Sequence, residues 1–143
     1  MKNTLLALAV CSLVAACGGE ADSGGEAAPQ TPSVTILEPA GGAELSGSTV
    51  TVRLAVTGMP IVPAGDMTPG TGHHHLYLDA ELAPATAPVP AVPGSIVHMG
   101  DASSTYTFEG VAPGEHRIIA VVADGAHVPV QPAVQDTVVF TVR

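Results

Sequence analysis

Short runs of alternating apolar and polar residues are the feature that most limits what this chain can fold into. In residues 49–57, Val50, Val52 and Leu54 fall on one face of an extended strand, and threonine, arginine and alanine fall on the other. This period of two is typical of a half-buried β-strand. No segment after residue 32 has a helical period of useful length, so the sequence predicts an all-β fold.

Six further segments have strand character, namely residues 33–38, 73–79, 95–98, 104–109, 116–123 and 136–142. Turn signals such as Pro113-Gly114 and Asp124-Gly125 separate them. The segment 116–123 is apolar on both faces, which predicts a central strand. About seven short strands predict an immunoglobulin-like or fibronectin-III-like β-sandwich over residues 33–143. The Pro- and Ala-rich stretch 80–94 is interpreted as an extended connector, with a ligand-specific loop as the alternative.

The first sixteen residues have the features of a secretory signal peptide. Lys2 precedes a mostly apolar run over residues 5–16, which is too short to span a bilayer as a stable helix. Small residues then precede Cys17 directly, which is the pattern of a bacterial lipoprotein cleavage site. We therefore predict that residues 1–16 are a lipoprotein signal peptide and that Cys17 is lipidated. An ordinary secretory cleavage near Ala16 is the alternative.

Residues 17–32 are predicted to form the lipidated cysteine and a flexible linker. After Cys17 this stretch is small and acidic and has no core-forming residue, as flexible tethers do. The acyl chains would attach the protein to a membrane of the cell envelope. Gly18, in place of an aspartate after the cysteine, favours the outer membrane.

The charge of the mature chain excludes one class of partner. Removal of Lys2 leaves three arginines against thirteen carboxylates, a formal charge of −10. Such a surface repels phosphate backbones, so we expect no nucleic-acid binding. With Cys17 lipidated, the mature chain would have no free thiol and no disulfide.

Five of the six histidines are predicted to lie at one end of the sandwich. In a fibronectin-like strand order, that end holds the start of strand 73–79 and the ends of strands 95–98 and 116–123. It therefore receives the triplet His73, His74 and His75, followed by His98 and His127. His116 begins its strand and is expected at the opposite end.

Alternation along the strand predicts which of these histidines can act together. His73 and His75 share a face, about 7 Å apart along the strand, and can hold one metal ion. His74 points the other way, and we expect it to pack toward the core and hydrogen-bond a backbone carbonyl. The predicted metal ligands are therefore His73, His75, His98 and His127.

Three methionines are candidates for an additional soft ligand: Met59, Met67 and Met99. Imidazole with thioether suits copper, whereas imidazole alone suits zinc or copper. The alternative to a metal site is a polar histidine network that joins three loops.

Catalysis has little support in the sequence. No serine or cysteine has a recognisable nucleophile context, and no phosphate-binding glycine loop or pair of carboxylates stands out. We therefore expect a protein that is not an enzyme. One hypothesis is a module that binds a transition metal for storage, delivery or sensing. Another is a structural or interaction module that recruits a protein or glycan, and a third is a pH-responsive module.

Four spaced motifs resemble a known family. They are Gly72-His-His-His-Leu-x-x-Asp79, His98-x-Gly100, Pro113-Gly-x-His116 and Asp124-x-x-His-x-Pro129. Over about Gly58 to Val142 the chain resembles a bacterial family of secreted domains of unknown function, family 4399. The resemblance implies an extracytoplasmic module with no known activity, and it adds His116 to the residues of interest.

Overall fold

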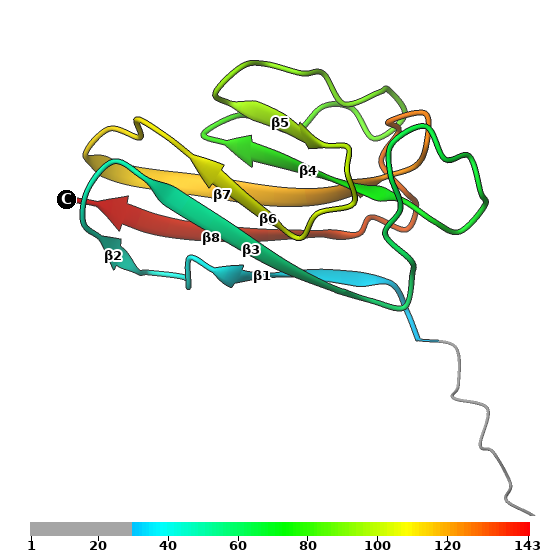
Figure 1. Cartoon of the computed structure of the whole chain (residues 1–143), viewed down its shortest axis with the longest axis horizontal. Helices are drawn as coiled ribbons and strands as arrows, with labels where there is room; N and C mark the ends of the chain where they lie inside the picture. Colours follow the sequence, from blue (N-terminus) through cyan, green and yellow to red (C-terminus); the bar gives the residue numbers. More distant parts are fainter. Residues whose placement is uncertain (1–29) are drawn as a thin grey trace, which may run out of the picture.

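The computed structural model describes residues 30–143, and its secondary structure in that range is entirely β (Figure 1). The strands are β1 (Ser33–Glu38), β2 (Glu44–Leu45), β3 (Val50–Thr57), β4 (His73–Leu78), β5 (Ile96–Met99), β6 (Thr105–Phe108), β7 (Gly114–Ala123) and β8 (Gln135–Val142). Within residues 30–143 no helix is long and apolar enough to cross a membrane. The predicted signal peptide, Cys17 and most of the predicted linker lie outside the described residues.

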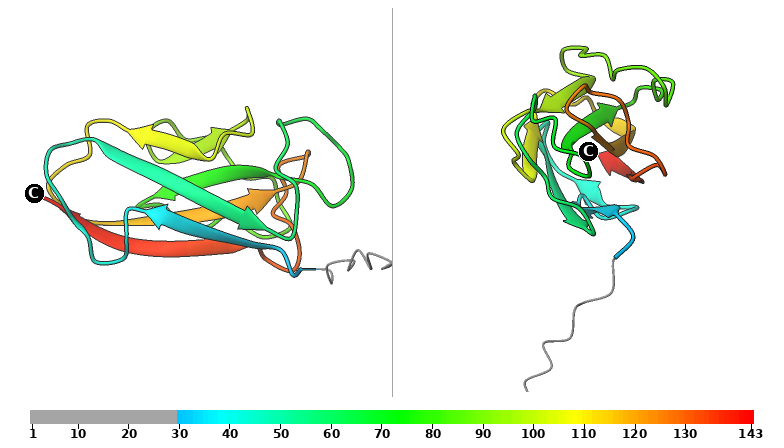
Figure 2. Two further views of the ribbon diagram at one scale, coloured as in Figure 1. Left: turned by 60° about the horizontal axis from the view of Figure 1, so that its bottom comes forward. Right: turned by 90° about the vertical axis from the view of Figure 1, so that its right-hand side faces the viewer.

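The strands form two sheets, in the orders β1-β3-β6 and β2-β8-β7-β4-β5. The pairings are antiparallel except for β2 with β8, which is parallel. The predicted all-β fold of two packed sheets is confirmed, and β7 is the central strand of the larger sheet (Figure 2). The immunoglobulin or fibronectin relationship stays a prediction.

Strand β2 was not predicted, because two residues are too few for an alternating pattern. The backbone N–H of Thr141 donates to Ala43, and that of Arg143 donates to Leu45, both at 2.8 Å. These bonds attach β2 to the edge of β8. The other seven strands begin and end within two residues of the predicted bounds.

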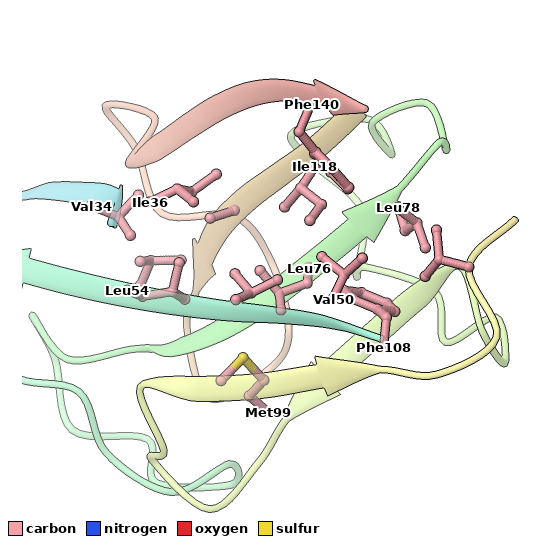
Figure 3. Packing of buried hydrophobic residues seen from close by; sticks show 14 of the residues in the cluster. Val34, Ile36, Val50, Leu54, Leu76, Leu78, Met99, Phe108, Ile118 and Phe140 are labelled. Carbon is pink, nitrogen blue, oxygen red and sulfur yellow. The ribbon is translucent and has the colours of Figure 1, made fainter. Parts of the chain in front are cut away.

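The main core lies between the two sheets (Figure 3). It includes Leu54 of β3, Phe108 of β6, Leu76 of β4, Ile118 of β7 and Phe140 of β8, each at most 4% exposed. Complete burial of such a side chain contributes about 1.5–3 kcal/mol to stability. These residues are the inward-facing members of the alternating patterns.

A second, smaller core covers the outer face of the larger sheet. It contains Tyr77, Ile96, Ile119 and Val121 together with Val89, which comes from the segment between β4 and β5. The segment interpreted as a connector thus packs against the sheet. All six residues of β4 are buried, and side chains on both of its faces are enclosed by protein.

Candidate metal centre

Four histidines meet at the end of the larger sheet where β4 begins and β5 and β7 end, the end that faces the viewer in the right-hand view of Figure 2. Their ligand nitrogens all lie within 4.8 Å of one another. They are the four residues selected from the sequence: His73, His75, His98 and His127. The strand register brings them together, because His75 pairs with His98 across β4 and β5, and His73 pairs with Ala123 at the end of β7.

Three of the four rings point nitrogen atoms at one another. Nε2 of His75 lies 3.0 Å from Nε2 of His73, and the latter lies 3.2 Å from Nδ1 of His127. The fourth ring, of His98, stacks on His75 with 12° between the ring planes and 5.0 Å between the centroids. All six centroid distances fall between 4.5 and 5.6 Å.

These distances fit a tetrahedral metal ion. Metal–nitrogen bonds of 2.0–2.1 Å in a tetrahedron place the ligand nitrogens about 3.3 Å apart. The separations of 3.0 and 3.2 Å among His73, His75 and His127 are close to that value. His98 supplies a fourth ring nitrogen, which lies within 4.8 Å of the other three. The residues present therefore fit such an ion.

Burial keeps the imidazole rings of His73 and His75 neutral. His73 and His75 are 0% and 1% exposed. Desolvation, followed by repulsion from the neighbouring histidines, lowers the pKa of His73 to about 4 and that of His75 to about 3. Burial, with a contribution from His127, also lowers the pKa of His98. At neutral pH these three imidazoles therefore carry lone pairs, as metal coordination requires.

Within residues 30–143, the rings of His73 and His75 have no hydrogen bond at their second nitrogen, Nδ1. Nδ1 of His73 and Nδ1 of His75 are buried and have no partner among the described residues. In most metal sites the second ring nitrogen donates to a carboxylate or carbonyl, which fixes the ring. Here packing and the nitrogen contacts among the histidines hold the rings. Each unsatisfied buried group lowers the stability of the folded state by about 1–3 kcal/mol, so the cluster destabilises the metal-free fold.

A glycine makes room for His98. A Cβ on Gly100 would lie 3.1 Å from Cε1 and 3.2 Å from Nε2 of the His98 ring. The carbonyl of Gly100 accepts a hydrogen bond of 3.0 Å from the N–H of Ala64, which ties this loop to the segment between β3 and β4. The His-x-Gly motif therefore has a steric basis.

His74 faces the main core, as predicted. It is 2% exposed, and its neighbours across the strands are Met99 and Val122. The expected hydrogen bond to a carbonyl is not seen at Nδ1, which has no partner among the described residues. Burial lowers the pKa of His74, so this ring is a neutral component of the core.

The structure separates Met99 from the predicted ligand set. Met99 is 4% exposed and points into the main core (Figure 3). Because it follows His98 directly in β5, the two side chains lie on opposite faces of the sheet. Met59 packs against the core, whereas Met67 is 67% exposed. Both line a cleft of about 580 Å³ whose lining includes none of the four clustered histidines.

His116 lies at the other end of β7, also as predicted. Its Nδ1 is 2.6 Å from Oδ2 of Asp79, and its Nε2 is 2.7 Å from the carbonyl oxygen of Ala112. Burial lowers the pKa of His116, but the bonds to Asp79 and Ala112 outweigh burial and the net pKa is raised. The sixth histidine therefore belongs to a separate ion pair.

Comparison with known proteins identifies a family and no activity. The model of DUF4399, described as a domain of unknown function, matches residues 52–143. No curated protein matches the sequence. A crystal structure of an engineered protein from the Northeast Structural Genomics Consortium is similar at a TM-score of 0.45 and 17% identity, covering 81% of this chain and 21% of that chain. This chain thus spans about a fifth of the length of that protein.

Proposed function

This chain belongs to the DUF4399 family, and we propose that it is a cell-envelope module that binds one transition-metal ion, copper or zinc, through His73, His75, His98 and His127. The convergence of four histidine rings, two of them fully buried, carries the proposal. Polar side chains are few in this domain, yet four of its six histidines lie together with their ligand nitrogens within 4.8 Å of one another.

The donor set selects the class of metal. The group contains imidazole nitrogens and no carboxylate. Calcium and magnesium prefer oxygen ligands, whereas imidazole suits zinc and copper. The proposed role is storage, delivery or sensing of the ion, and no catalytic role is included.

Attachment to the envelope is the second part of the proposal. It is supported by the signal-peptide pattern that ends at Cys17. Acyl chains on Cys17 would hold the domain at a membrane, with the outer membrane favoured by Gly18. Mass spectrometry of the protein from cell membranes should find a diacylglyceryl modification on Cys17, which Cys17→Ser should abolish.

A histidine network without metal is the second candidate. It is favoured by the close nitrogen contacts of His73 with His75 and His127, and by the bond of 2.8 Å from the N–H of Val89 to the carbonyl of His127. In that case the histidines would join loops of a structural module that recruits a protein or glycan.

Calorimetric titration with copper and with zinc separates the two candidates. The parent is the full chain carrying Cys11→Ser and Cys17→Ser, so that no thiol competes for the metal. We expect one ion per chain, lost in His73→Ala/His75→Ala and retained in His116→Gln, which alters the distant histidine. His98→Ala, at an exposed position, tests the same site if the buried double variant unfolds. Affinity weaker than micromolar for both metals in the parent would refute the metal proposal.

A further inference from the structure

The loop that follows β7 contains a residue that the metal site needs without itself being a ligand. We infer that Asp124 is the positioning residue of the histidine cluster, because its hydrogen bonds hold His127 in the backbone conformation that brings that ring to the other three. This inference rests on the proposed function, since it concerns how one ligand of that site is held.

His127 has an unusual backbone conformation. Its φ is 66°, in the left-handed region that residues other than glycine rarely adopt. Such a conformation persists only where surrounding contacts maintain it, and it is common at functional sites. The side chain that results is half-buried, with its Nδ1 3.2 Å from Nε2 of His73.

Asp124 supplies the contacts that maintain it. Its Oδ1 accepts hydrogen bonds from the N–H groups of Ala126 and Val128, both at 2.9 Å. Its carbonyl accepts from the N–H of His127, and its own N–H donates to the carbonyl of Val128, again at 2.9 Å. Four hydrogen bonds from one residue thus enclose the segment 124–128.

Other aspartates in neighbouring loops do less. Oδ1 of Asp66 accepts one backbone N–H, from Thr68, and Oδ1 of Asp101 accepts one, from Ser103. Each of these bonds closes a single local turn. The doubly accepting oxygen of Asp124 is what distinguishes the turn that presents His127.

Packing fixes the turn from two sides. A Cβ on Gly125 would lie 2.2 Å from the carbonyl oxygen of Asp66, so the segment between β3 and β4 is in close contact with it. On the other side the carbonyl of His127 accepts the N–H of Val89. With both flanks held, the position of the His127 ring depends on the backbone that Asp124 organises.

Two substitutions separate geometry from charge. Asp124→Asn keeps a carbonyl oxygen in the place of Oδ1 but removes the charge. Asp124→Glu keeps the charge but moves the carboxylate out by one methylene, so that it no longer accepts both N–H groups. Asp101→Glu makes the same change in the loop after His98 and serves as the matched control.

Electron paramagnetic resonance of the Cu²⁺-loaded full chain, in the thiol-free parent described above, tests the inference by counting nitrogen ligands. The parent, Asp124→Asn and Asp101→Glu should show four nitrogens. Asp124→Glu should show three, with the spectrum of His127→Ala, and should release copper to a chelator at least tenfold faster than the parent. An Asp124→Glu spectrum like that of the parent, or an Asp124→Asn spectrum with three nitrogens, would overturn the positioning role. A parent that binds neither copper nor, in the calorimetric titration above, zinc would refute the proposed function, and the inference with it.

Discussion

His116 and Asp79 join β7 to the end of β4 through a contact of 2.6 Å between Nδ1 and Oδ2. The second ring nitrogen of His116 lies 2.7 Å from the carbonyl oxygen of Ala112. A carboxylate and a carbonyl can only accept hydrogen bonds, so both ring nitrogens must donate. This geometry selects the imidazolium form. Oδ1 of Asp79 also accepts the N–H of Arg117, so the carboxylate binds two successive residues of β7 and links the motif that ends at Asp79 to the one that ends at His116.

The pH dependence of stability should show this ion pair. The pKa of His116 is raised in the folded protein, so its contribution is fully present below the ordinary value of 6.5 and is lost as the pH rises through the raised pKa. Asp79 is 46% exposed, so we expect a loss of about 1 kcal/mol or less. The buried histidines with lowered pKa values make stability rise with pH near 6.5 in both proteins. The decline due to His116 is therefore measured as a difference: the excess thermal stability of the parent over His116→Gln should shrink between pH 6 and 9. A nuclear magnetic resonance titration that places the pKa of His116 at or below 6.5 would contradict the assignment.

Replacement of the buried His75 by an apolar residue should separate metal binding from the stability of the fold. His75→Leu removes a buried Nδ1 that has no partner in the described part of the chain and keeps most of the side-chain volume. It also removes the Nε2 contact with His73, whose Nε2 keeps its contact with His127. Substitution of an unsatisfied polar group by an apolar one is close to neutral or stabilising. In metal-free protein we therefore expect a melting temperature equal to or above that of the parent, together with a metal affinity well below that of the parent. A fall of more than about 2 kcal/mol in the free energy of unfolding would favour the histidine network over the metal site.

Bound metal should raise the melting temperature. A ligand that binds the folded state alone, at a hundred times its Kd, stabilises it by about 2.7 kcal/mol. For a domain of this size that is a rise of about 10 °C. Calorimetric scans with free copper or zinc at about a hundred times its Kd should show the rise, and a chelator should reverse it. His98→Ala should reduce the rise, whereas an equal rise in that variant would exclude His98 from the site.

Gly100→Ala should weaken the site with little effect on the fold. The added Cβ would displace the His98 ring, which lies 3.1 Å from that position. We expect a loss of roughly tenfold in metal affinity, comparable to the loss of an orienting contact in other metal sites. Gly41→Ala is the matched control, because no atom lies within 4 Å of its Cβ position. Equal affinities in the two variants would show that the room beside His98 does not matter.

The sequence was sufficient for much of the fold because its signals are local. Alternation in segments such as Val50–Thr57 predicts strands, and strand direction then places His73, His98 and His127 at one end. Alternation also contained the evidence against Met99, since a residue adjacent to His98 in a strand faces the other way.

Other features depend on contacts between distant segments. The second core under Val89 could not be predicted, because nothing in a Pro- and Ala-rich stretch specifies the surface on which it packs. The same holds for the hydrogen bond of His116 with Asp79, whose partners are 37 positions apart. The positive φ of His127, which the four bonds of Asp124 maintain, is likewise specified by no local pattern in the sequence.

The burial of every residue in β4 has a consequence for the accuracy of folding. A slip of one residue against β7 would exchange the positions of His73 and His75 with those of His74 and Leu76. It would place Leu76 among the histidine rings on the outer face of the larger sheet, and it would move His75 into the apolar space between the sheets. On an ordinary half-exposed strand, solvent would tolerate part of such an error. Here both misplaced side chains would be enclosed by protein. The shifted registers that separate the four histidines are therefore much less stable than the native one.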